Sequence, residues 1–200
     1  MSRKKAPAPW QQDALNAIAC LKSGGVLLHA TDTLWGLAAD ATNPAAVQRI
    51  YTIKNRLLEK PLLMLVSNSR MVEMLQPGLP EEAWELMDVS DRPLTIIAPF
   101  APACRYSIHS ALVNTSGSCA VRMTHDPYCQ FIIEGLGKPL ASTSANKSGG
   151  ESPATFLHIE PDVKAEVDYI GIHGQKNEAP QSPSMLVEFD ANNRFQIIRP

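Results

Sequence analysis

Small hydroxyl residues and cationic residues recur at the ends of apolar stretches in this chain. The hydroxyls stand in four places, Thr31-Asp32-Thr33, Thr95, Ser142-Thr143-Ser144 and Ser182/Ser184. The cations near comparable points are Lys54, Arg56, Lys60, Arg122, Lys147 and Arg199. Hydroxyls and backbone N–H groups beside Lys and Arg suit an anionic ligand, phosphate above all. The competing interpretation is that each hydroxyl only serves a turn and each cation is solvated.

The stretch ASTSANKSGG (141–150) resembles two catalytic motifs and fits neither. A P-loop needs G-x-x-x-x-G-K-[ST], and Ala141 and Asn146 stand at its two glycine places. The S-x-x-K box of serine hydrolases needs S-D-N and K-T-G partners, and neither triplet occurs in the chain. Without a visible activating base, we do not expect Ser144 to be a nucleophile.

The His and Cys residues of the chain are not spaced as a metal site requires. There is no H-E-x-x-H, no C-x-x-C pair, and the five histidines show no ligand spacing. We therefore expect no protein-bound metal. His29, inside an apolar stretch, is interpreted as a hydrogen-bonded core residue.

Composition limits the class of protein. With 200 residues, 44% of them hydrophobic, one domain over residues 10–200 is expected after a loose tail at 1–9. A net charge of −2 is not that of a protein that binds nucleic acid through its overall positive charge. Any RNA contact would therefore be local or shared with a partner. The longest apolar run, Leu62 to Val66, is far shorter than the ~20 residues of a membrane span. A cytoplasmic protein fits these observations.

Apolar periodicity predicts the elements that must position the polar residues. Helices are predicted at 10–22, 44–54 (after the Asn43 cap), 69–75, 80–88 and 126–136. Strands are predicted at 26–30, 61–66, 93–99, 118–123, 138–142, 168–173, 185–189 and 195–198, with a polar loop at 174–183. Because strands and helices do not alternate strictly, the fold class is α/β (α+β), with a mixed sheet flanked by helices.

Several segments together resemble one family. They are ATDTLWGLAADATN (30–43), IYTIKNRLLEKPLLMLV (50–66), RPLTIIAP (92–99), AVRM (120–123), LASTSANKSGGESP (140–153) and IIRP (197–200). In this order they resemble the threonylcarbamoyl-AMP synthase family, YrdC/Sua5/YciO, in its short form. The resemblance covers nearly the whole chain, and the S-A-N-x-S-G core makes it specific.

The resemblance implies a twisted mixed sheet around a concave, basic cavity. It also implies a reaction in which L-threonine, bicarbonate (or CO₂) and ATP give L-threonylcarbamoyl-AMP and pyrophosphate. A separate transferase complex would then modify the adenosine at position 37 of tRNA, and a weak direct tRNA contact is compatible with this role. Such chemistry needs positioned substrates and charge neutralisation rather than a covalent nucleophile.

Roles for single residues are implied by the same motifs. Lys54 and Arg56, from the K-x-R at a helix end, correspond to the catalytic clamp on phosphate and carbamate. The implied threonine and bicarbonate contacts are Thr31, Trp35, Lys60, Arg122, Ser142 and Ser184. The implied ATP contacts are Lys54, Arg56, Thr95, Ser144, Asn146 and Arg199. Mg²⁺ is expected to arrive with ATP as part of the substrate, with no tightly bound cofactor.

The chain departs from the family pattern at a few places. Ala30 and Leu57 stand where Pro is usual, Trp35 where Tyr is usual, and Met185 where a hydroxyl is usual. The Gly-rich stretch before Ser184 is absent. The alternative function is that of a YciO-like protein, which binds RNA or nucleotide on the same fold without synthase activity.

Overall fold

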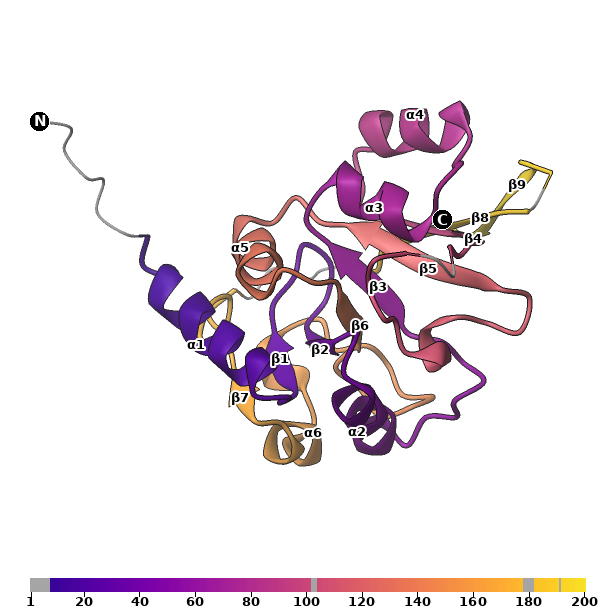
Figure 1. The fold of residues 1–200 in the computed structure, drawn as a ribbon. Coiled ribbons are helices and arrows are strands. Elements are labelled where there is room, and N and C mark those ends of the chain that lie inside the picture. The colour runs from indigo at the N-terminus through magenta and orange to yellow at the C-terminus, as the bar shows by residue number, and fades with distance from the viewer. Residues whose placement is uncertain (1–7, 102–103, 178–181, 191) are drawn as a thin grey trace, which may run out of the picture.

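One mixed β-sheet organises the chain. The computed structural model describes residues 8–101, 104–177, 182–190 and 192–200, so most of the predicted tail at 1–9 and part of the predicted loop at 174–183 lie outside the described residues. The sheet has nine strands in the order β7-β1-β2-β6-β3-β5-β4-β8-β9 (Figure 1). They are β1 (Leu27–His29), β2 (Gly36–Asp40), β3 (Leu63–Val66), β4 (Leu94–Pro99), β5 (Ser118–Met123), β6 (Leu140–Ser144), β7 (Tyr169–Ile170), β8 (Met185–Phe189) and β9 (Phe195–Arg199).

Parallel and antiparallel pairs both occur in this sheet. The pairs β1–β7, β3–β5 and β4–β8 are parallel, and the other neighbouring strands are antiparallel. The helices that flank it are α1 (Gln11–Lys22), α2 (Pro44–Lys54), α3 (Ser69–Leu75), α4 (Glu81–Val89), α5 (Pro127–Leu136) and α6 (Pro161–Glu166), with 3₁₀ turns η1 (Ser110–Leu112) and η2 (Phe156–His158). The predicted α/β class with a mixed sheet is confirmed.

Helix ends follow the local sequence. The Asn43 side chain accepts hydrogen bonds from the N–H groups of Ala45 and Ala46, and Pro44 occupies the first turn of α2, as predicted. Asp126 caps α5 in the same way through the N–H of Cys129. Helices α1 and α5 lie side by side (Figure 1), and Gly135 permits their close approach, because a Cβ there would come within 2.4 Å of Ile18 Cδ1.

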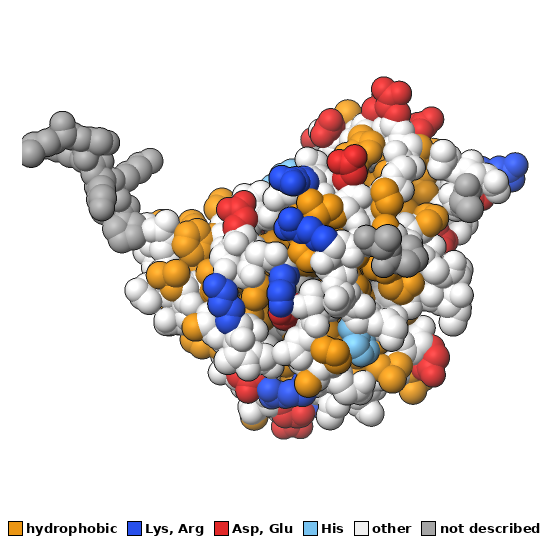
Figure 2. All heavy atoms as spheres, in the orientation of Figure 1, with side chains coloured by type: hydrophobic (Ala, Val, Ile, Leu, Met, Phe, Trp, Pro, Cys, Tyr) orange, Lys and Arg blue, Asp and Glu red, His pale blue; other side chains and the backbone are white. Residues whose placement is uncertain are grey.

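The core occupies the interior of the sheet and the helix faces against it. All residues of β1 and β2 are buried. A separate small cluster lies under α4 and consists of Ala83, Leu94, Ile96, Ala98, Val187 and Phe189. Acidic side chains gather over α4, whereas Lys and Arg side chains gather over the middle of the same face (Figure 2).

Four elements of the structure differ from the sequence predictions. The strand β2 was not predicted, because its sequence GLAAD carries small residues in place of the β-branched residues typical of strands. Helix α6 was also not predicted. The strand predicted at 168–173 is reduced to β7, because the backbone N–H groups of Ile172 and His173 turn to the Asp13 carboxylate of α1, at 2.9–3.0 Å.

The strand predicted at 138–142 lies two residues further along the chain. Residues 142–144 belong to β6, because Ser142 and Ser144 pair with Ala38 and Gly36 of the unpredicted strand β2. The hydroxyls of this segment therefore stand on a strand rather than in a loop after it. The single domain over residues 10–200 stays a prediction.

Candidate active site

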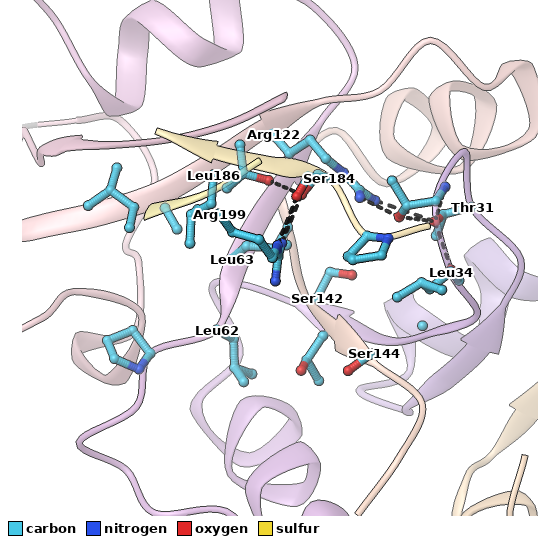
Figure 3. A pocket seen from close by; sticks show the side chains of 18 of the residues that line it. Thr31, Leu34, Leu62, Leu63, Arg122, Ser142, Ser144, Ser184, Leu186 and Arg199 are labelled. Atoms are coloured by element: carbon cyan, nitrogen blue, oxygen red, sulfur yellow. Dashed lines mark hydrogen bonds between the residues drawn. The ribbon is translucent and has the colours of Figure 1, made fainter. Parts of the chain in front are cut away.

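A cavity of about 360 Å³ lies over one face of the sheet (Figure 3). It spans β2, β6, β3, β5, β4, β8 and the end of β9, together with the segments that follow β1 and α2. Its polar lining residues are Thr31, Thr33, Arg56, Thr95, Asn114, Ser118, Arg122, Ser142, Thr143, Ser144, Ser152, Ser184 and Arg199. The arrangement brings together the hydroxyls and cations that are scattered along the sequence.

Arg122 of β5 is the buried cation of the site. Its side chain is 4% exposed, and its guanidinium donates hydrogen bonds to the hydroxyls of Thr33 and Thr31. Asp32 stands 3.3 Å from it, and burial lowers the pKa of Arg122 despite this carboxylate. The Nε of Arg122 is buried and has no hydrogen-bond partner among the described residues, so one donor of this side chain remains unpaired.

The Thr31 hydroxyl is committed to the protein itself. It donates to the Leu34 carbonyl at 2.8 Å and accepts the Thr33 N–H at 3.1 Å. It also lies 3.0 Å from the Thr33 hydroxyl. Since a hydroxyl has one proton and two lone pairs, little capacity remains for a ligand. Thr31 thus lines the cavity while it holds Arg122 in place.

Thr95, Ser184 and Arg199 meet beside Arg122, because Thr95 is the partner of Arg122 in the β4–β5 pair. The Thr95 and Ser184 hydroxyls are 2.7 Å apart, and both residues are buried. Arg199 of β9 donates to the Ser184 carbonyl from Nε at 3.0 Å and from a terminal nitrogen at 2.8 Å (Figure 3). The sheet order places β8 beside β4 and β9 beside β8, which brings the end of the chain to this site.

Arg56 enters the cavity because α2 ends in a left-handed turn. Asn55 has φ of 49° there, and Arg56 then bends back so that its guanidinium donates to the carbonyls of Lys60 and Pro61 at 2.9 and 3.1 Å. Burial lowers the pKa of Arg56 below its usual value. Trp35, 3% exposed and packed on Phe156 with ring centroids 4.9 Å apart, provides an apolar wall.

Lys54, one position before that turn, points into the protein instead. Its side chain is 1% exposed, and Nζ donates to the carbonyls of Ser144 and Asn146, the former at 2.6 Å. Burial lowers the pKa of Lys54 to about 7, and the charge of Arg56 acts in the same direction. Lys54 therefore stabilises the turn after β6 by hydrogen bonds from the protein interior.

The electrostatics of the cavity favour an anion. Arg56, Arg122 and Arg199 line it, and its described lining residues include neither Asp nor Glu. Within the described part of the chain, no group of three or more His, Cys, Asp or Glu could hold a metal ion. In that same part, no helix is long and apolar enough to cross a membrane.

Comparison with known proteins identifies the family. The sequence model of the Sua5/YciO/YrdC family, described as telomere recombination, matches residues 19–200. The chain belongs to the Sua5/YciO/YrdC family.

Two threonylcarbamoyl-AMP synthases are among the relatives of this chain. A threonylcarbamoyl-AMP synthase of Pseudomonas aeruginosa PAO1 is 30% identical over 185 residues, which cover 90% of this chain and 92% of that protein. One of Bacillus subtilis 168 is 33% identical over 152 residues, 76% of this chain but only 43% of that longer protein.

Solved structures of the family share the fold. A P. abyssi Sua5 variant matches with a TM-score of 0.81 at 24% identity, over 98% of this chain and 58% of that one. E. coli YciO matches with a TM-score of 0.81 at 19% identity, over 96% and 90%.

Most of the site residues predicted from the family resemblance line the cavity. They are Thr31, Trp35, Arg56, Thr95, Arg122, Ser142, Ser144, Ser184 and Arg199. Lys54, Lys60 and Asn146 are not among the lining residues. Lys54 and Asn146 are buried beneath the cavity, and Lys60 is exposed in the loop after α2. The functional roles of all twelve stay predictions.

Sequence reasoning missed three polar lining residues, Asn114, Ser118 and Ser152. Asn114 lies between η1 and β5, and its side chain accepts hydrogen bonds from the N–H groups of Ser116 and Ser118. An Asn in such a turn looks the same in the sequence whether or not it lines a cavity. Ser118 opens a correctly predicted strand, but nothing in the sequence indicates which face of that strand it takes.

Proposed function

We propose that this protein is an L-threonylcarbamoyladenylate synthase, a nucleotidyltransferase that converts L-threonine, bicarbonate and ATP into L-threonylcarbamoyl-AMP and pyrophosphate. The observation that carries the proposal is a cavity with three arginines in a chain 30% identical to a named threonylcarbamoyl-AMP synthase along 90% of its length. The P. abyssi Sua5 structure in complex with L-threonine adds a relative that binds this amino acid.

The proposed reaction requires that the substrates be positioned and that the negative charge of the phosphates be neutralised. The threonine amine adds to the carbon of CO₂, which bicarbonate supplies, and loses a proton to give a carbamate. A carbamate oxygen then attacks the α-phosphorus of ATP, and the bond to the leaving pyrophosphate breaks. Negative charge develops on phosphate oxygens throughout, and fixed cations in a site shielded from water stabilise it.

We propose that the lining residues divide between the two substrates. Arg122 and Ser142, which both line the cavity, are proposed to hold the threonine carboxylate and hydroxyl, with Trp35 against the side chain. Arg56, Thr95, Ser184 and Arg199 are proposed to hold the nucleotide and its phosphates. ATP enters with Mg²⁺ as its substrate complex, and no tightly bound cofactor is proposed.

The product is a reactive mixed anhydride, so a second protein must consume it. We propose that a tRNA threonylcarbamoyl transferase does so, which places this protein in tRNA modification in the cytoplasm. A direct contact with tRNA, where present, would be local, because the net charge of the chain is −2.

The decisive assay follows pyrophosphate from ATP. Release that requires both threonine and bicarbonate is expected. Absence of release, together with salt-sensitive RNA binding, would favour the YciO-like alternative instead.

Replacing Arg56 tests the phosphate clamp. Arg56→Ala removes a guanidinium that lines the cavity, and we expect pyrophosphate release to fall at least 100-fold, since fixed charges of this kind contribute about 10²–10³ to turnover. Circular dichroism should report an unchanged fold. Arg70→Ala, on the exposed start of α3, is the matched control and should retain full activity. Normal turnover in the Arg56 variant would mean that the clamp lies elsewhere.

A further inference from the structure

The apolar wall that Trp35 gives to the cavity depends on two segments outside the family motifs. Trp35 stands between β1 and β2, and its carbonyl accepts the N–H of Ala145, just after β6, at 2.9 Å. The backbone of Trp35 is thereby fixed. Its indole lines the cavity and has two neighbours, Phe156 and Gly174, that do not line it. The position of the ring therefore depends on residues behind the wall.

Phe156 belongs to a stack of three side chains that ends on Trp35. Its ring lies against the indole with centroids 4.9 Å apart and planes tilted by 49°. Lys164 of α6 lies over the Phe156 ring, with Nζ 4.4 Å from its centroid. Both contacts are attractive and hold the Phe156 ring in one place. The 3₁₀ turn that carries Phe156 is closed by the side chains of Thr155 and His158, 2.9 Å apart.

Gly174 approaches the indole from a second segment. A Cβ on Gly174 would come within 2.6 Å of Ala30 Cβ and 3.8 Å of Trp35 Cζ2, an atom of the six-membered ring of the indole. With φ of 81°, Gly174 also has a backbone conformation that favours glycine. The turn therefore packs on Ala30 and lies beside the indole, at two positions where this chain departs from the family pattern.

The turn at Gly174 is itself anchored to the core. The Asp13 carboxylate of α1 accepts the N–H groups of Ile172 and His173, at 3.0 and 2.9 Å. The His173 ring stacks on Tyr128 with centroids 4.6 Å apart. Because both neighbours of the indole are held in this way, the indole cannot move away from the cavity without breaking contacts.

A fixed wall limits the size of a side chain that lies beside it. Trp35 is proposed above to lie against the side chain of threonine, whose Cβ carries a hydroxyl and a methyl group. One further methylene in an apolar pocket changes kcat/KM by about 10–200-fold. A wall that yields would lose much of this discrimination.

We propose that Phe156 and Gly174 are positioning residues, which hold the Trp35 indole in place and thereby limit the amino-acid substrate to a side chain of the size of threonine. The inference rests on the proposed function and deepens it to the specificity of the amino-acid site. Neither residue touches the substrate, because each acts through the indole.

The test compares two amino acids that differ by one methylene. They are L-threonine and L-3-hydroxynorvaline of the same configuration, in which an ethyl group replaces the methyl. Pyrophosphate release with ATP and bicarbonate gives kcat/KM for each, and their ratio measures the preference for threonine. For a variant with slow turnover, dissociation constants of the two compounds, measured by calorimetry with Mg²⁺ and a non-hydrolysable ATP analogue, give the corresponding ratio.

Phe156→Ala should reduce the preference for threonine by about 10-fold, because the indole gains room to move back. The KM for ATP should stay unchanged. Leu157→Ala is the matched control on the same 3₁₀ turn, since that side chain is 77% exposed, and should match the wild type. In a Trp35→Phe background, where the indole is absent, adding Phe156→Ala should change the ratio much less than it does in the wild type.

Gly174→Ala should also reduce the preference, by about 3-fold, because the new Cβ must push the turn away from Ala30 and the indole. Gly78→Ala is the matched control. Gly78 has a similar φ of 77°, but nothing lies within 4 Å of a Cβ placed there, so the preference should not change.

Three outcomes would overturn the assignment. An unchanged ratio in Phe156→Ala and Gly174→Ala would mean that neither residue sets the size of the site. An equal loss with both amino acids would mean a structural role only. Full additivity with Trp35→Phe would mean that Phe156 does not act through the indole. Failure of the proposed function looks different, because the wild type itself would then release no pyrophosphate with threonine and bicarbonate.

Discussion

Arg122 should stabilise the folded protein even though it is a buried charge. Its guanidinium donates to Thr31 and Thr33 and pairs with Asp32, while its side chain is 4% exposed. Arg122→Met keeps a long stem but removes these contacts. Breaking a buried pair costs about 3–5 kcal/mol. Asp32 retains the Thr124 hydroxyl at 2.9 Å, so the loss should lie at the lower end, about 3 kcal/mol of unfolding free energy.

Urea unfolding followed by tryptophan fluorescence measures this loss. Arg92→Met, at an exposed arginine before β4 whose side chain makes no hydrogen bond or ion pair among the described residues, should change stability by less than about 0.5 kcal/mol. Adding Asp32→Asn to Arg122→Met should recover part of the loss, because the unpaired carboxylate is then neutral.

An Arg122→Met protein as stable as the wild type would refute this reasoning. It would mean that the cost of removing the guanidinium from water cancels all of its internal contacts. Arg122 would then make no net contribution to stability and would be kept for its ligand. A destabilised variant with no recovery in the double mutant would instead place the energy in the Thr31 and Thr33 hydroxyls.

Two further predictions concern groups outside the cavity. Burial, with the positive charge of Arg122, lowers the pKa of the fully buried His29 to about 4. The unfolded chain protonates near pH 6.5, so this contribution to stability is complete above pH 6.5 and declines as pH falls toward 4. His29→Leu should remove about 2 kcal/mol of the stability difference between pH 7.5 and 5.0, measured by urea unfolding. Asp13→Asn should cost about 2–3 kcal/mol, because its amide N–H₂ would replace one of the two oxygens that now accept from the Tyr128 and Tyr169 hydroxyls, at 2.8 and 2.6 Å, and would face the backbone N–H of Ile172. A loss under 1 kcal/mol in thermal or urea unfolding would contradict that account.

Local signals in the sequence predicted the elements well where the side chains that cause them are adjacent. The Asn43-Pro44 and Asp126-Pro127 pairs mark two helix starts, and both helices begin there. The structural role of Asp13 could not be predicted from its sequence neighbours. In the sequence it is an acidic residue in the first turn of a helix, but in the fold its carboxylate binds a turn about 160 residues away. Long-range hydrogen bonds of this kind leave no periodic trace.

The site was predictable in its composition but less so in its geometry. The clustering of hydroxyls and cations at strand ends predicted an anion site, and nine of the twelve predicted residues line the cavity. Lys54 and Arg56 look equivalent in the K-x-R motif. The left-handed turn at Asn55 separates them, so that Arg56 lines the cavity and Lys54 is buried beneath it.

Hydrogen-bond capacity decides which of the polar groups in the family motifs can contact a substrate. The Thr31 hydroxyl donates to the Leu34 carbonyl and accepts from Thr33 and Arg122. Both N–H groups of the Asn146 amide donate to backbone carbonyls. Neither can gain a ligand contact without losing an internal one. Ser142 makes no hydrogen bond through its hydroxyl among the described residues, so it is free to donate or accept. Substitution of Ser142 should therefore act on binding alone, whereas substitution of Thr31 or Asn146 should act on stability and, through Arg122 and Ser144, on binding as well.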